Sequence, residues 1–181
     1  TNTGATVAEN STGNTISTLM LDTTDVDNID DQLVYTITTA TTNGTIRLNG
    51  TALTVGQTFA QADIDAGLVN YDHDGSETSS DSFTFSVDDG AGTASTGIFH
   101  LSITPVNDNN PIITSNGSAP TAVIDVFENT TAVTTVTAAD ADLPGQAISY
   151  SISGGADAAL FTIDSSTGAL SFNSARDREN P

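Results

Sequence analysis

The chain of 181 residues contains no cysteine, tryptophan or lysine, and it carries three basic residues against 23 acidic ones. The resulting net charge is −20. Nucleic acids and anionic membranes are bound through Lys and Arg side chains that neutralise phosphate, so this composition excludes both as partners. The acidic field favours cations, although a generally solvated acidic surface has the same composition.

The sequence also lacks a signal peptide and any run of 18 apolar residues, so it predicts neither a targeting segment nor a membrane span. The absence of cysteine favours an extracellular β protein that needs no disulfides over a cytosolic protein. The sequence begins and ends abruptly. We therefore expect a segment of a larger protein, secreted or displayed on a bacterial cell surface.

Residues for catalysis are scarce. His73 and His100 are too few for a transition-metal cluster, and no Gly-x-Ser-x-Gly motif is present. Carboxylates are abundant, but they lie in polar loops and not in the apolar cleft that keeps one acid of a glycosidase protonated. The sequence therefore predicts that the protein is not an enzyme.

A carbohydrate-binding module is the alternative function. Such modules commonly bind sugars on an exposed aromatic platform. This chain has no tryptophan, and Tyr35, Tyr71 and Tyr150 occupy strand positions that predict core residues. Binding to surface polysaccharide stays open as the second hypothesis.

Apolar residues alternate with polar ones along most of the chain, which is typical of strands with one buried face. Threonine fills many outward positions, and turn pairs such as Asn49-Gly50 recur at short intervals. The only helix-like stretch is residues 60–67. Short strands without a long helix predict an all-β, antiparallel, Greek-key sandwich. The clearest alternating runs are Leu33/Tyr35/Ile37, Phe83/Phe85/Val87, Phe99/Leu101/Ile103 and Ile148/Tyr150/Ile152.

One polar stretch between two prolines, residues 105–111, divides the chain. Proline fixes φ and removes a backbone donor, so this stretch predicts a linker and not a central strand. Its Asn107, Asp108 and Asn109 supply carboxylate and amide oxygens, which are the ligands that Ca²⁺ takes. A polar hinge without a metal has the same composition, so both interpretations stand at this point.

The two halves repeat one layout. Each begins with Glu-Asn and a small hydroxyl residue, at residues 9–11 and 128–130. Each continues with an Asp-x-Asp, at residues 25–27 and 140–142, and then with a tyrosine-bearing strand. A repeat of this length indicates tandem domains of one architecture.

Four motifs stand out in the second half: Glu128-Asn129, residues 138–142, residues 161–170, and Asp177-Arg178-Glu179-Asn180. Four others stand out in the first half, at residues 44–46, 63–67, 71–77 and 87–90. On these motifs the second half resembles a cadherin repeat, and the first half resembles the cadherin-like repeats of large bacterial surface proteins.

The resemblance implies Ca²⁺ bound at the junction of successive domains, which stiffens the rod. Pro105 stands where the family has an acid, so we expect one or two ions in place of a full set. The implied linker ligands are Glu9, Asp74, Glu77, Asn107, Asp108, Asn109, Asp140 and Asp142.

Two further half-sites are implied at the outer ends of the pair. The ligands at the start of the first domain are Asp25, Asp27 and Asp89, and those at the end of the second domain are Asp177 and Glu179. Their remaining ligands would come from neighbouring repeats of the same protein.

The sequence thus predicts a cadherin-like sandwich over residues 1–106, a calcium-binding linker over residues 107–111, and a C-terminally truncated cadherin repeat over residues 112–181. The expected function is calcium-dependent adhesion or rigid spacing outside the cell. The expected partners are Ca²⁺, neighbouring repeats, and either like molecules or surface polysaccharide. On the first half's spacing the second domain lacks about two strands, so we expect it to be loosely ordered, completed by another chain, or continued by further sequence.

Overall fold

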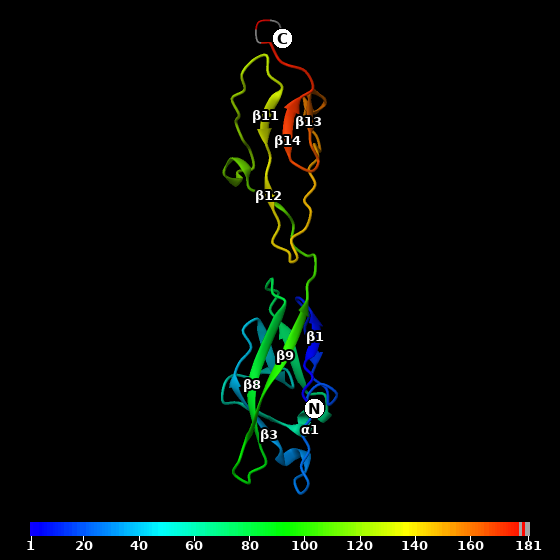
Figure 1. Ribbon diagram of the computed structural model, residues 1–181, viewed down its shortest axis with the longest axis vertical. Helices are drawn as coiled ribbons and strands as arrows, with labels where there is room; N and C mark the ends of the chain where they lie inside the picture. Colours follow the sequence, from blue (N-terminus) through cyan, green and yellow to red (C-terminus); the bar gives the residue numbers. More distant parts are fainter. Residues whose placement is uncertain (178, 180–181) are drawn as a thin grey trace. The chain divides into compact units, whose positions relative to one another are not determined.

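The computed structural model describes residues 1–177 and 179, and the chain divides into two compact units, Thr1–Asn107 and Asp108–Pro181. In both units the regular secondary structure is mostly β-strand, and in the second unit the strands are short and are joined by long irregular segments (Figure 1). Among the described residues, no helix is long and apolar enough to cross a membrane.

The first unit is a sandwich of two sheets. The strand order is β1-β9-β8-β3-β6 in one sheet and β2-β7-β4-β5 in the other. The strands are β1 (Ala5–Ala8), β2 (Asn14–Thr15), β3 (Val34–Thr39), β4 (Gly44–Leu48), β5 (Thr51–Ala52), β6 (Thr58–Ala60), β7 (Val69–His73), β8 (Ser80–Asp88) and β9 (Ser95–Thr104). A 3₁₀ turn, η1 (Asp30–Gln32), and a short helix, α1 (Gln61–Asp65), complete the unit.

The apolar residues of the predicted alternating runs form the core of this sandwich. Tyr35 of β3 stacks on Phe59 of β6, with ring centroids 4.9 Å apart, and Phe83 of β8 packs against Phe99 of β9 at 5.3 Å. All four rings are buried because successive side chains of a strand point to opposite faces. The antiparallel all-β prediction is therefore confirmed; one pair, β1 with β9, runs parallel.

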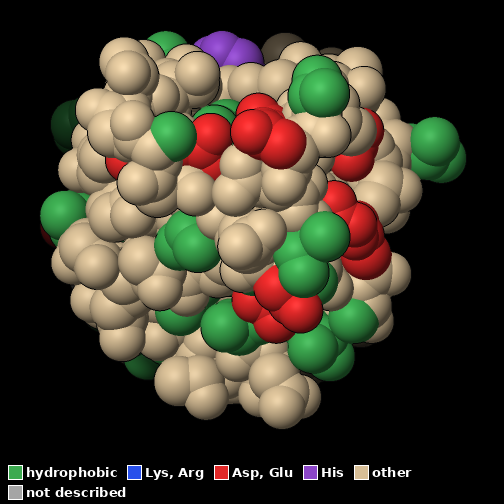
Figure 2. All heavy atoms as spheres, turned by 90° about the horizontal axis from the view of Figure 1, so that it is seen from below, with side chains coloured by type: hydrophobic (Ala, Val, Ile, Leu, Met, Phe, Trp, Pro, Cys, Tyr) green, Lys and Arg blue, Asp and Glu red, His purple; other side chains and the backbone are tan. Residues whose placement is uncertain are grey.

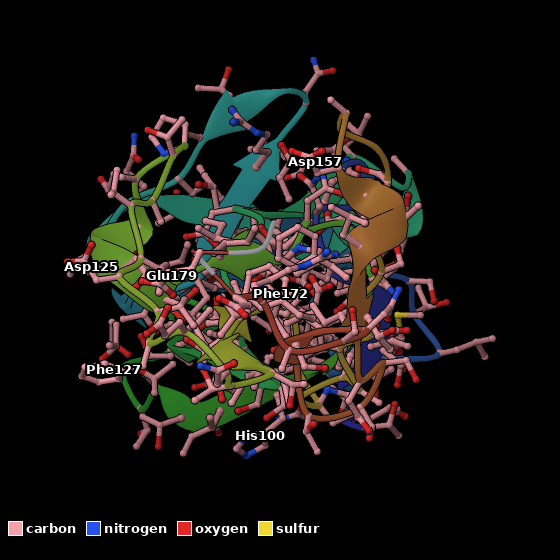
Figure 3. All side chains as sticks on the ribbon, turned by 90° about the horizontal axis from the view of Figure 1, so that it is seen from above. His100, Asp125, Phe127, Asp157, Phe172 and Glu179 are labelled. Atoms are coloured by element: carbon pink, nitrogen blue, oxygen red, sulfur yellow. The ribbon has the colours of Figure 1, made fainter. Side chains whose placement is uncertain are left out.

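The second unit is built from smaller sheets, ordered β10-β12 and β11-β14-β13. Its elements are β10 (Ile112–Ile113), η2 (Ser115–Ser118), β11 (Ala132–Thr135), β12 (Ala138–Ala139), η3 (Ala158–Leu160), β13 (Phe161–Ile163) and β14 (Ala169–Phe172). Phe172 packs on Phe161 at 4.8 Å, whereas Phe127 lies at the periphery of the view in Figure 3 and is largely exposed.

The strand predicted from Ile148, Tyr150 and Ile152 is wrong. Apolar and polar residues do alternate here. Within the described residues, however, the segment makes one backbone hydrogen bond, from the N–H of Tyr150 to the carbonyl of Ser165. A strand requires a ladder with a neighbour, and alternation alone does not provide one. Ile148 is half-buried, and Ile152 is exposed.

Gly168 ends the tight turn before β14, and no other residue fits there. Its φ is +70°, and a Cβ atom at this position would overlap the carbonyl oxygen of Val136. We expect Gly168→Ala to destabilise the second unit by about 1–2 kcal/mol for the left-handed conformation, and by about 1–3 kcal/mol more for the clash.

Gly117→Ala is the matched control, because Gly117 has nearly the same φ, of +74°, but a Cβ atom added there would have no described atom within 4 Å. Urea denaturation of both variants separates the cost of backbone conformation from the cost of the clash. Equal losses in the two variants would contradict the predicted contact with Val136.

Candidate metal centre

Glu9 follows β1 directly, and its carboxylate lies inside the protein. The backbone N–H of Glu9 donates to the carbonyl of Thr104 at the end of β9, which fixes the residue beside the start of the linker. The side chain is 3% exposed, and its Oε2 accepts the N–H of Val106 at 3.0 Å. Its Oε1 is buried and has no hydrogen-bond partner among the described residues. A buried carboxylate oxygen without a partner is costly, so a bound cation would satisfy it.

Glu77 lies close to Glu9. A carboxylate oxygen of each residue is within 4.8 Å of the other, and Glu77 comes from the loop between β7 and β8. Two carboxylates at this separation repel each other unless a proton or a cation lies between them. The sequence-predicted ligands Glu9 and Glu77 are thus brought together within the first unit, and they fit a hard divalent cation.

Asp74 differs from these two residues. Its side chain is exposed, and its Oδ1 accepts the N–H of Ser76, which closes a local turn. In the described part of the chain, Asp74 does not join the group of closely spaced carboxylate oxygens around Glu9 and Glu77. Asn107, predicted as the next ligand, is exposed at the end of the first unit.

Asp142 organises the beginning of the second unit. It is 1% exposed, and its Oδ1 accepts the backbone N–H groups of Asp108 and Asn109 at 3.4 and 3.0 Å. The side-chain amide of Asn109 also donates to Oδ1, and that of Gln146 donates to Oδ2. Burial would raise the pKa of Asp142, but the hydrogen bonds from Asn109 and Asp108 outweigh it and hold the pKa below the usual value. Asp142 is therefore an anion around which the predicted ligands Asp108 and Asn109 gather.

The two Asp-x-Asp motifs form the same turn. The N–H of Asp142 donates to Oδ1 of Asp140, and the N–H of Asp27 donates to Oδ1 of Asp25, both at 3.0 Å. The backbone hydrogen bond from Asp27 lowers the pKa of Asp25, whereas hydrogen bonding to Asp25 and its charge raise the pKa of Asp27.

The N-terminal half-site residues also lie together. Asp25 and Asp89 line one surface pocket, and the charge of Asp89 contributes to the raised pKa of Asp27. Acidic side chains are prominent in the view from this end of the first unit, shown in Figure 2.

At the other end of the chain, three exposed acids form a compact group. Carboxylate oxygens of Glu128, Asp177 and Glu179 all lie within 4.8 Å of one another. The N–H of Glu179 donates to Oδ1 of Asp177 at 3.0 Å, and Figure 3 labels Glu179 in this part of the second unit. Arg178 and Asn180, which belong to the same motif, lie outside the described residues.

Sequence reasoning missed two residues of these sites. Glu128 joins Asp177 and Glu179, and its position in the repeated Glu-Asn motif, equivalent to that of Glu9, was the available signal. His73 is buried beside the loop that carries Glu77. The alternation of Val69, Tyr71 and His73 along β7 was enough to predict its burial.

Two β-sandwich-type units in tandem, with carboxylates gathered at their ends, define a class of extracellular repeat modules. The family described as Cadherin-like matches residues 1–103, and the Cadherin domain family matches residues 122–181. The chain belongs to the cadherin-like family. These matches point to a non-enzymatic adhesion domain.

The similar curated proteins come from animals. Extracellular matrix organizing protein FRAS1 of Mus musculus is 34% identical over 117 residues, covering 56% of this chain and 3% of that protein. FRAS1-related extracellular matrix protein 2 of Homo sapiens is 31% identical over 128 residues, covering 71% of this chain and 4% of that protein. The chain thus spans only a few per cent of these relatives. The comparisons support the cadherin-like part of the sequence prediction but give no support for a bacterial origin.

Solved structures agree on the fold. Mouse Cadherin-23 EC22-24 is 25% identical with a TM-score of 0.57, covering 99% of this chain and 53% of that one. The Protocadherin GammaB4 extracellular domain is 20% identical with a TM-score of 0.60, covering 100% of this chain and 29% of that one. At 20% identity, the similarity to the Protocadherin GammaB4 structure shows a shared fold and nothing more.

Proposed function

We propose that the chain is a calcium-binding adhesion or spacer module of a larger extracellular protein, in which Ca²⁺ stiffens the linker at residues 105–111. The single observation that carries the proposal is the buried carboxylate of Glu9, whose Oε1 has no hydrogen-bond partner in the described residues and which lies close to the Glu77 carboxylate. The donor set is entirely oxygen, which suits Ca²⁺ and not a softer metal.

The proposed mechanism begins with the two acids that hold the linker. Glu9 accepts the N–H of Val106 in the first unit, and Asp142 accepts the N–H groups of Asp108 and Asn109 in the second. Glu9 and Glu77 are the residues of the first unit that would hold Ca²⁺, and the ion would supply the positive charge that offsets their carboxylates. An ion that engages ligands from both domains favours the interdomain arrangement that brings them together, and so restricts the hinge.

The extracellular location is part of this proposal. The relatives named above are extracellular matrix proteins by name, and extracellular calcium modules bind with dissociation constants on the order of 10⁻⁴–10⁻³ M or tighter. Neighbouring repeats and like molecules are the expected partners. The alternative of a carbohydrate-binding module is disfavoured, because Tyr35 and Tyr71 are fully buried and offer no platform.

We expect small-angle scattering of the whole chain to show a narrower range of particle dimensions with Ca²⁺ than with a chelator. Asp142→Ala should weaken Ca²⁺ binding by at least about 10-fold, because it releases the backbone of Asp108 and Asn109 from the anion that orders it. Asp157→Ala removes the same charge from an exposed position and is the matched control. Identical scattering profiles with Ca²⁺ and with chelator would rule out the stiffening mechanism.

A further inference from the structure

His73 is a buried imidazole at the end of β7 that joins two loops. The side chain is 3% exposed, and its Nδ1 accepts two backbone N–H groups, those of Asn10 and Gly75, each at 3.1 Å. A nitrogen that accepts hydrogen bonds carries no hydrogen, so the ring hydrogen lies on Nε2. From there it donates to Oγ1 of Thr78 at 3.2 Å.

The two loops that His73 joins are the ones that carry Glu9 and Glu77. Asn10 follows Glu9 and has a left-handed φ of +55°. Gly75 is two residues before Glu77, and its φ is +81°. The loops touch, since a Cβ atom on Gly75 would lie 3.2 Å from Oδ1 of Asn10. The imidazole therefore fixes how far apart the two carboxylate-bearing segments lie.

The second unit connects its two equivalent loops through a backbone carbonyl and not through a side chain. Its Glu-Asn turn has the same form: Asn129 has a φ of +60°, and Oγ1 of Thr130 donates to the carbonyl of Phe127, as Oγ of Ser11 donates to that of Ala8. Here the N–H of Asn129 donates to the backbone carbonyl of Arg176 at 2.7 Å.

Arg176 precedes Asp177 as His73 precedes Asp74, so the two acceptors occupy equivalent places in the repeat. The acidic loop of the first unit has one more residue, since Asp74 and Glu77 are three residues apart while Asp177 and Glu179 are two apart. In the first unit the imidazole of His73 takes the place of the backbone carbonyl, and it also accepts the N–H of Gly75 in the longer loop.

We propose that His73 is a positioning residue that sets the separation of Glu9 and Glu77, and thereby the affinity of the first unit for Ca²⁺. This inference rests on the proposed calcium function. It assigns to His73 no contact with the ion. The required property is a hydrogen-bond acceptor at the position of Nδ1.

Three substitutions at this position separate the acceptor from the bulk of the ring. His73→Asn places an amide oxygen near the position of Nδ1, His73→Gln extends its amide toward the position of Nε2, and His73→Leu has no acceptor. Calorimetric titration of the whole chain with CaCl₂ at one fixed pH measures the affinity. We expect His73→Asn to stay close to wild type, and His73→Gln and His73→Leu to lose about 10–100-fold.

Amide hydrogen exchange in chelator provides a second readout that does not need Ca²⁺. The amides of Asn10 and Gly75 should exchange slowly in wild type and His73→Asn, and faster in the other two variants. The proposal is overturned if all three variants keep wild-type affinity, or if the affinity loss follows overall stability and not the acceptor position. If wild type binds no Ca²⁺, the proposed function and the affinity role both fail, whereas slow exchange of the two amides would still establish the connection between the loops.

Discussion

Replacing Glu9 with glutamine is expected to change the stability of the first unit in opposite directions with and without calcium. In chelator, Glu9→Gln removes a buried charge whose Oε1 has no partner in the described residues and which lies near the Glu77 carboxylate. The amide oxygen can still accept the N–H of Val106. We expect a gain in unfolding free energy of about 1 kcal/mol or more without calcium.

With calcium, the same substitution removes a ligand, and the affinity should fall by about 10–100-fold or more. Wild type gains about 2.7 kcal/mol of stability when free Ca²⁺ is 100 times the dissociation constant; at the same Ca²⁺ the variant loses about half of that gain if its affinity is 10-fold weaker, and most of it if its affinity is 100-fold weaker. Thermal unfolding in chelator and in a CaCl₂ series measures both effects. Asp157→Asn controls for the loss of one negative charge, and a Glu9→Gln variant whose stability still rises with Ca²⁺ as in wild type would contradict the assignment of Glu9 as a ligand.

Asp81→Ala is expected to destabilise the first unit by about 3–5 kcal/mol, because hydrogen bonds to a buried charged group are strong and their donors would be left without a partner. Asp81 is buried at the start of β8. Its Oδ1 accepts the N–H and the hydroxyl of Thr42, and its Oδ2 accepts the N–H of Asn43 at 3.0 Å and the hydroxyl of Tyr71 at 2.9 Å. Burial, and then the hydrogen bond to Asp81, raise the pKa of the Tyr71 hydroxyl, which therefore stays a donor.

Asp81→Asn keeps one carbonyl-type acceptor and should lose less than Asp81→Ala. Asp88→Ala, at the other end of the same strand, removes an acid whose side chain accepts only a local turn N–H, that of Gly90, among the described contacts, so it controls for charge. Urea denaturation, followed through NMR signals of the first unit, measures the three losses. A loss below about 1 kcal/mol for Asp81→Ala would contradict the anchoring role.

Alternation in the sequence was sufficient for the first unit because each predicted strand has a long neighbour. The Phe83/Phe85 run pairs with β9 from Ser80 to Val87, so its period-two pattern and its hydrogen-bonded ladder agree. The Ile148–Ile152 run has the same pattern and no such ladder in the described chain, so the prediction failed there. Periodicity in the sequence indicates which face of a segment is buried. Whether the segment forms a strand depends on a hydrogen-bonded neighbouring strand, which only the tertiary structure supplies.

The acid motifs were predicted in the same way, one segment at a time. Asp-x-Asp encodes its own local turn, in which the first carboxylate accepts the N–H two residues later, and both copies form it. The closeness of Glu9 to Glu77 could not be deduced locally, since these residues are far apart in the chain and meet only where β1 and β7 end.

By itself, the sequence determined the all-β class, the repeated layout and the hard-oxygen character of the ligand set, because these follow from periodicity, turn chemistry and side-chain type. Only the tertiary structure decided that Glu9 is buried with one oxygen left without a partner among the described residues, and that His73 joins the two loops beside it. Burial and hydrogen-bond acceptance depend on which segments the sandwich brings together, and no local pattern in a single strand contains that information.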